Sequence, residues 1–136
     1  MQSKGKDLIL KLGIGFLSFM LVVMFLYVIS SFYQAGEIYT HSEDSLLGNI
    51  ERGQYGNLVS NVYDNEICNV KVTANMAECY AVAHYFEAAS FYKVYLQNGY
   101  TEKAEEKKKI MEEQKQFMGD LAYTVEEIDE KLGLGD

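Results

Sequence analysis

The uncharged run at residues 12–33 constrains the fold of this chain more than any other feature. It reads LGIGFLSFMLVVMFLYVISSFY, which is 22 residues without Asp, Glu, Lys or Arg. As an α-helix it would extend roughly 33 Å, enough to cross the hydrocarbon core of a bilayer. A cleaved signal peptide has a shorter apolar region that ends in small residues, whereas the bulky Tyr33 stands near the nearest candidate cleavage site. We therefore predict an uncleaved membrane anchor.

The charges on the two sides of this run predict its orientation. Residues 1–11 contain three lysines and one aspartate, whereas residues 34–136 contain 19 acidic and 9 basic residues. Because positive charges beside a span stay on the cytoplasmic side, we expect a cytoplasmic N-terminus and an extracytoplasmic C-terminal domain at the plasma membrane. So acidic a domain is unsuited to nucleic acid, whose phosphates are neutralised by Lys and Arg.

Hydrophobic periodicity predicts that the C-terminal domain is all-α. The chain contains no Pro, which removes the strongest helix breaker, and apolar residues recur at helical spacing. A loop is expected at 64–72, and a short strand at 68–72 stays open as an alternative. The expected helical segments are 34–52 with a break near His41, 55–63, 74–98 and 101–132. Together they predict a small bundle of helical hairpins.

Polar residues mark the expected helix ends. Ser42 or Asp44 is suited to the N-cap of the first segment after its break, and Thr73 to the N-cap of the third. Gly99, directly after Asn98, is suited to the left-handed position that ends a helix. The third segment is the most apolar after the anchor, so we expect it to be central.

The last segment carries an apolar seam. Apolar residues repeat there every seven positions, as in a heptad pattern: Ala104, Met111, Met118, Val125 and Leu132. A break at Gly119-Asp120 is an alternative to one continuous helix. In that case Thr124 and Glu127 would form a capping box for a short final helix.

Two stretches resemble the tetratricopeptide repeat. YLQNGYTEKAEE, residues 95–106, places Tyr95 four residues before a turn glycine and Ala104 five residues after it, as the repeat does. LGNIERGQYGNLVSNV, residues 47–62, is similar to the beginning of the repeat and its turn. The resemblance implies helical hairpins that bind peptides or proteins on a concave face. It transfers no ligand residues to this chain.

The two cysteines, Cys68 and Cys79, allow two interpretations. Outside the cytoplasm they could form a disulfide. Such a bond would close a small loop and stabilise the domain by about 2–3 kcal/mol. Alternatively both are thiols, with Cys79 partly buried in the third helix. The spacing is not that of a redox motif, so we expect no redox role.

Four residues of the third segment are candidates for contact with a partner: His84, Glu87, Phe86 and Tyr95. The first two stand three positions apart, where a helix brings side chains together, and such a pair could bind a metal or sense pH. A hydrogen-bonded structural pair is the simpler interpretation. Phe86 lies among polar positions, which favours a contact with another chain or a neighbouring helix.

The sequence contains no pattern typical of an enzyme. It has no glycine-rich phosphate loop, no serine-histidine-aspartate order and no distinct pair of carboxylates. We expect no catalytic residue, no metal site and no cofactor. The expected function is a membrane-anchored protein-interaction or scaffold domain with a protein partner. One alternative is an accessory subunit whose anchor packs into a larger membrane complex, and another is an extracytoplasmic sensor or enzyme that uses His84 and Glu87.

Overall fold

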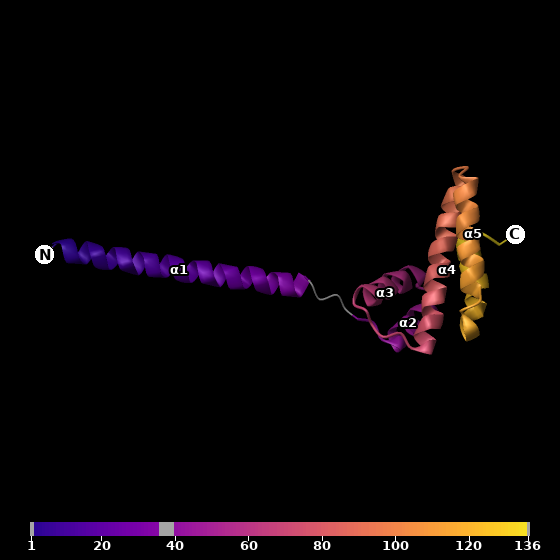
Figure 1. Cartoon of the computed structure of the whole chain (residues 1–136), viewed down its shortest axis with the longest axis horizontal. Coiled ribbons are helices and arrows are strands. Elements are labelled where there is room, and N and C mark those ends of the chain that lie inside the picture. Colours follow the sequence, from indigo (N-terminus) through magenta and orange to yellow (C-terminus); the bar gives the residue numbers. More distant parts are fainter. Residues whose placement is uncertain (1, 36–39, 136) are drawn as a thin grey trace. The chain divides into compact units, whose positions relative to one another are not determined.

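The computed structural model describes residues 2–35 and 40–135, and within these two ranges all regular structure is helical. The all-α prediction is therefore confirmed. The chain divides into two compact units, Met1–Ile38 and Tyr39–Asp136. The elements in chain order are α1 (Gln2–Ala35), α2 (Glu43–Glu51), α3 (Tyr55–Ile67), α4 (Ala74–Gln97), α5 (Thr101–Lys115), the 3-10 helix η1 (Gly119–Tyr123) and α6 (Thr124–Leu132) (Figure 1).

The first unit is the single helix α1. Its stretch Gly5–Ser31 is long and apolar enough to cross a membrane. Large apolar side chains are exposed from Leu8 to Ile29, around the whole circumference of the helix. The helix starts at Gln2, earlier than the apolar run predicted at 12–33. A helix that is apolar on every side is typical of a membrane span or of the centre of a large protein.

In the second unit α4 is the central helix, as expected, and it contacts α2, α3, α5, η1 and α6. Four of its buried residues are alanines: Ala81, Ala83, Ala88 and Ala89. Their small side chains let the neighbouring helices approach closely. Figure 1 shows α5 antiparallel to α4 along its length, with α2 and α3 beside the lower part of α4. The upper part of the α4–α5 hairpin extends beyond them.

The predicted ends of α2 and α4 are confirmed. Ser42 accepts a hydrogen bond from the amide of Ser45 (3.3 Å), and Thr73 accepts one from the amide of Met76 (3.2 Å). Each hydroxyl satisfies an amide that the first turn leaves without a helical partner. The expected continuation of the first segment through residues 36–39 lies outside the described residues.

The turn between α4 and α5 is a Schellman motif. Gly99 has a φ of +74°, which an L-residue adopts at a cost. Its amide donates to the carbonyl of Leu96 (3.1 Å), and the amide of Tyr100 donates to the carbonyl of Tyr95 (2.9 Å). These bonds satisfy carbonyls that the helix end leaves free.

The prediction for residues 64–72 is wrong in two respects. Helix α3 continues to Ile67, and the residues between it and α4 form no strand. Asn69 ends the helix instead, with a φ of +52°, and the amide of Val70 donates to the carbonyl of Asn65 (3.0 Å). Asparagine tolerates the left-handed conformation because its short polar side chain bonds locally.

The C-terminal segment is broken, as the alternative predicted, but the predicted capping box is wrong. Thr124 donates its hydroxyl to the carbonyl of Leu121 (2.7 Å), and Glu127 accepts the hydroxyl of Tyr55 (2.7 Å). The reason is that η1 leads directly into α6. Thr124, which would be the N-cap of the box, itself has helical dihedrals, φ −65° and ψ −18°, whereas an N-cap residue has an extended backbone.

Candidate protein-binding site

Three of the four predicted partner-binding residues lie along one side of α4. His84, Glu87 and Tyr95, with Phe91 between them, are spaced i, i+3, i+7 and i+11, which places them on one stripe of a helix. Phe86 lies on another side. Its ring stacks on that of Tyr55 in α3, with centroids 5.5 Å apart, so its partner within this chain is a neighbouring helix.

The end of α3 partly covers the lower part of this stripe. His84 Nε2 lies 3.2 Å from a carboxylate oxygen of Glu66, and the Tyr63 hydroxyl donates to Glu87 at 2.9 Å. The Tyr63 ring also meets the His84 ring edge-on, at 6.3 Å. The pKa of Tyr63 is raised above its ordinary value, most by the hydrogen bond to Glu87 and next by burial. His84 and Glu87 therefore each pair with α3, and they act as packing contacts between two helices.

The upper part of the stripe is uncovered. Phe91 is 44% exposed, Val94 49% and Tyr100, just past the turn, 57%. Tyr95 links Phe91 and Tyr100, because its ring lies 6.1 Å from that of Phe91 and 6.3 Å from that of Tyr100. Exposed apolar residues that occur singly need no explanation, whereas a contiguous group on one face marks an interaction surface.

Two lysines of α5 lie over these rings. Lys103 Nζ is 5.7 Å from the ring centre of Tyr95 and 5.4 Å from that of Tyr100, and Lys107 Nζ is 5.3 Å from that of Phe91. Each ring face attracts the cation above it. Within the described part of the chain, the ion pairs within 4.0 Å do not include either lysine.

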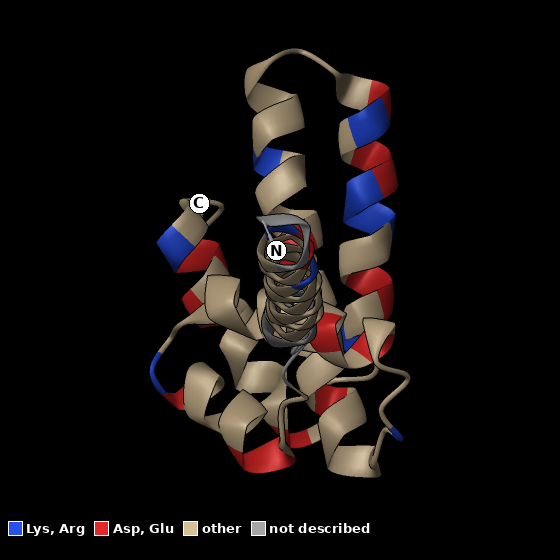
Figure 2. Cartoon of the chain, turned by 90° about the vertical axis from the view of Figure 1, so that its left-hand side faces the viewer, with Lys and Arg blue, Asp and Glu red and all other residues tan. Residues whose placement is uncertain are grey.

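We call the group formed by Phe91, Val94, Tyr95, Tyr100, Lys103 and Lys107 the hairpin strip. Figure 2 shows both signs of charge along α5, whereas the upper part of α4 is almost free of charge. The sequence agrees, since residues 88–98 contain Lys93 as their one charged residue. The strip is thus an aromatic surface with two cations on one flank. Its aromatic side chains are of the kind that is enriched at protein interfaces.

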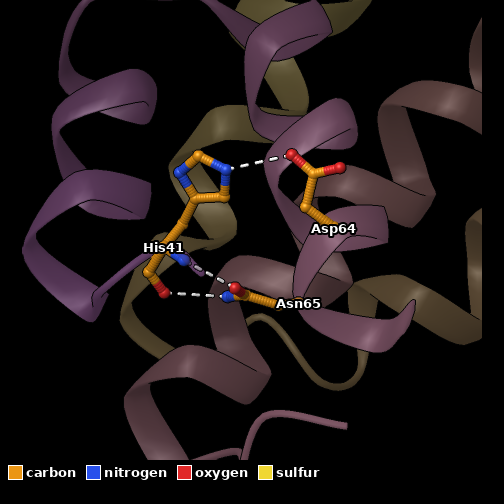
Figure 3. A network of polar contacts seen from close by, with 3 residues as sticks. All are labelled: His41, Asp64 and Asn65. Carbon is orange, nitrogen blue, oxygen red and sulfur yellow. Dashed lines mark hydrogen bonds and ion pairs between the residues drawn. The ribbon is translucent and has the colours of Figure 1, made fainter. Parts of the chain in front are cut away.

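Hydrogen bonds among His41, Asp64 and Asn65 hold the beginning of the domain in place (Figure 3). Asn65 is fully buried; its amide donates to the carbonyl of His41 (2.8 Å) and its oxygen accepts from the amide of His41 (2.6 Å). The His41 ring lies 3.0 Å from Asp64. The segment that precedes α2 is therefore bound to the last turns of α3.

Sequence reasoning missed this group, although one signal was present. Leu58, Val62 and Asn65 follow at i, i+4 and i+7 on the buried face of α3. A polar residue at an apolar position needs a hydrogen-bond partner inside the fold. The pattern could have predicted such a partner but not its identity.

Cys79 is a buried thiol. Burial, followed by the negative charges of Glu43 and Glu78, raises its pKa to about 11. Because the thiolate is the reactive form, this pKa and the burial should make Cys79 react slowly with thiol reagents at neutral pH. The predicted disulfide between Cys68 and Cys79 stays a prediction. In the part of the chain that the structure describes, no group of three or more His, Cys, Asp or Glu could hold a metal ion.

Comparisons of the chain with protein-family models, with curated proteins and with solved structures gave no match. The resemblance to tetratricopeptide repeats therefore stays a prediction. What can be assigned to this chain is a fold: an apolar N-terminal helix and an all-α domain whose α4–α5 hairpin carries an exposed aromatic strip.

Proposed function

We propose that the protein is anchored in a membrane by α1 and that its helical domain binds a partner protein through the hairpin strip, without catalysis. The observation that carries the proposal is the contiguous exposure of Phe91, Val94 and Tyr100 around Tyr95 on one face of the hairpin. A partner that covered this face would remove apolar surface from water, which is favourable at about 25 cal/mol per Å².

The anchor is supported by the composition of α1. In water its exposed apolar side chains would drive aggregation, whereas a bilayer provides the apolar surroundings that they need. The lysines at its N-terminal end favour a cytoplasmic N-terminus and an extracytoplasmic domain at the plasma membrane. Carbonate extraction tests the anchor, because an integral protein stays in the pellet. Protease added to sealed cells tests the orientation, because it should digest the domain.

Binding is tested with the full chain in its native membrane. Phe91→Ala combined with Tyr95→Ala should abolish co-purification of a partner after crosslinking. The matched control is Phe117→Ala with Tyr123→Ala, which removes two aromatic side chains that are also exposed, 58% and 54%, but lie outside the strip. Equal loss in both variants, or no loss in the strip variant, would contradict binding through this face.

A replacement of the anchor separates the two functions that the sequence left open. In this variant residues 12–33 are replaced by a run of Leu and Ala of the same length. A partner that binds through the strip should be retained, because the domain is unchanged. Loss of the partner on anchor replacement, with retention in the strip variant, would favour an accessory subunit that is held through its membrane helix.

A further inference from the structure

The hairpin strip has the form of a helix-binding surface. Its lower neighbour, α3, already packs on the same side of α4 through Tyr63, which contacts His84 and Glu87. Above this contact α4 and α5 continue side by side, and Phe91, Val94 and Tyr100 are exposed there. From this geometry, and resting on the proposed function, we infer that the strip binds an amphipathic α-helix of the partner, and that this helix runs parallel to α4.

The first argument concerns the backbone of the bound segment. An extended peptide must satisfy its amides and carbonyls, and it does so most readily at the edge of a sheet. The interiors of α4 and α5 offer no such edge, since their own helical bonds use those groups. A helix satisfies its backbone internally and can place only side chains against Phe91, Val94 and Tyr95.

The second argument concerns dimensions. From Glu87, where the contact with α3 ends, to Gly99 beside the strip, the chain extends over 12 residues, which is roughly 18 Å or a little more than three helical turns. Phe91 and Tyr95 form an i, i+4 ridge, the kind of ridge that packs into the groove of another helix. A partner helix of three to four turns would cover it.

The third argument concerns direction. The end of the strip nearest α3 borders a negative region, which contains Glu87, Glu66 and the C-terminal end of α3. The upper half is flanked by Lys103 and Lys107. A helix carries partial positive charge at its N-terminus and partial negative charge at its C-terminus. The favourable orientation therefore places the N-terminus of the partner helix beside Glu87 and its C-terminus beside Lys103, which is parallel to α4.

The surface of a membrane is a weaker occupant for the same strip. An anionic leaflet is a plane that faces much of the domain, and residues 34–136 have a surplus of ten negative charges. A bound helix contacts the strip alone, and charges beyond about 8 Å are screened from it at physiological ionic strength. The two lysines are therefore sufficient to attract the C-terminus of one helix. They are too few to hold an acidic domain against an anionic bilayer.

The test measures the spacing of contacts along the partner. Photoreactive p-benzoylphenylalanine replaces Tyr63 in one variant of the full chain and Tyr100 in another, in native membranes, and the crosslinked residues are mapped by mass spectrometry. A parallel helix places the residue crosslinked from position 100 about 12 residues C-terminal to the one crosslinked from position 63. An extended segment would give an offset of roughly 5–6 residues. The probe at Phe117 is the control and should not reach this segment.

Charge reversal tests the direction independently. Lys103→Glu with Lys107→Glu should lower the crosslinking yield roughly 5- to 30-fold, since each lysine near a helix C-terminus contributes a modest attraction. Lys108→Glu with Lys109→Glu makes the same change of charge at exposed positions of α5 outside the strip and should leave the yield unchanged. Equal effects of the two double variants would contradict a specific role of the strip lysines.

The outcomes separate this inference from the proposed function. An offset of about 12 residues in the stated direction supports it. A short offset or the reverse order overturns the helix or its direction, while binding of a partner at the strip still holds. Crosslinks only to lipid, only to a second copy of this chain, or to nothing at either position overturn the inference and the proposed function together.

Discussion

The contact between Asn65 and His41 allows a quantitative prediction. Asn65→Ala removes both hydrogen bonds that hold the main chain of His41 to α3. The side chain is fully buried, so the substitution also leaves a small cavity. We expect a stability loss that exceeds that of an ordinary surface substitution, while the domain still folds.

The magnitude follows from the groups left without partners. A buried amide or carbonyl that loses its hydrogen bond costs about 1–3 kcal/mol. Two such groups would cost about 2–6 kcal/mol. Both bonds to His41 are only partly buried, so water can partly replace them, and the total should lie near the lower end, about 3 kcal/mol. Asp64→Ala removes only the contact to the His41 ring. Both of those side chains are partly exposed, 20% and 38%, so its cost should be below about 1 kcal/mol.

The measurement is urea unfolding of the full chain in a mild detergent, followed by far-UV circular dichroism. Helix α1 stays folded in detergent, so the transition reports the domain. With a slope of about 1.5 kcal/mol per molar urea, Asn65→Ala should lower the midpoint by about 2 M. The matched control is Asn57→Ala, an exposed asparagine of the same helix, which should change the midpoint little. A midpoint for Asn65→Ala that equals that of the control would refute the reasoning.

Three further predictions concern the turns, the tyrosines and the buried thiol. Gly99→Ala and Gly119→Ala should each cost about 1 kcal/mol through their positive φ, as thermal unfolding would measure. Nothing lies within 4 Å of a new Cβ at Gly99, and at Gly119 the nearby Glu78 carboxyl ends a flexible side chain that can move away. Burial and hydrogen bonds to Glu127 and Asp129 raise the pKa of Tyr55 and Tyr85 above the ordinary value of 10.0. Their contribution to stability should therefore be complete below pH 10 and be lost as the pH rises above it, because the tyrosines of the unfolded chain then ionise more readily than those of the folded domain. Tyr55→Phe with Tyr85→Phe should reduce this loss of stability at alkaline pH. An unchanged dependence of stability on pH would contradict the prediction. At pH 8 iodoacetamide should modify Cys79 about 100-fold more slowly than an exposed cysteine, as a pKa of about 11 implies. Rapid modification would contradict the burial of Cys79. If Cys79 stays unmodified in the unfolded chain and reacts only after a reductant is added, the disulfide with Cys68 is established.

The positions of the helices could be predicted because their signals are local. Thr73 and Ser42 accept hydrogen bonds from amides three residues ahead, and Gly99 ends α4 through bonds within five residues. The error at the capping box has a local and a distant cause. The backbone of Thr124 is already helical, and the carboxylate of Glu127 accepts a hydrogen bond from Tyr55, 72 residues away in the chain.

The candidate site shows the same division. The spacing of His84, Glu87 and Tyr95 on one helix predicts a common stripe, which the structure contains. Which part of the stripe is covered depends on where α3 ends and crosses α4, and no local pattern contains that information. For the same reason the sequence pointed to Phe86, which is stacked on Tyr55, as a contact residue, whereas the side chain exposed on the strip is Phe91.

The sequence by itself determined the apolar N-terminal helix, the all-α class and most helix ends, because each depends on residues within a few positions of one another. Tertiary structure alone decided that Asn65 holds His41, that α3 covers His84 and Glu87, and that the aromatic strip between Phe91 and Tyr100 stays open. Burial and pairing are properties of segments brought together by folding. Two side chains in similar local sequence patterns can therefore differ in burial, since one lies in the core and the other on the surface.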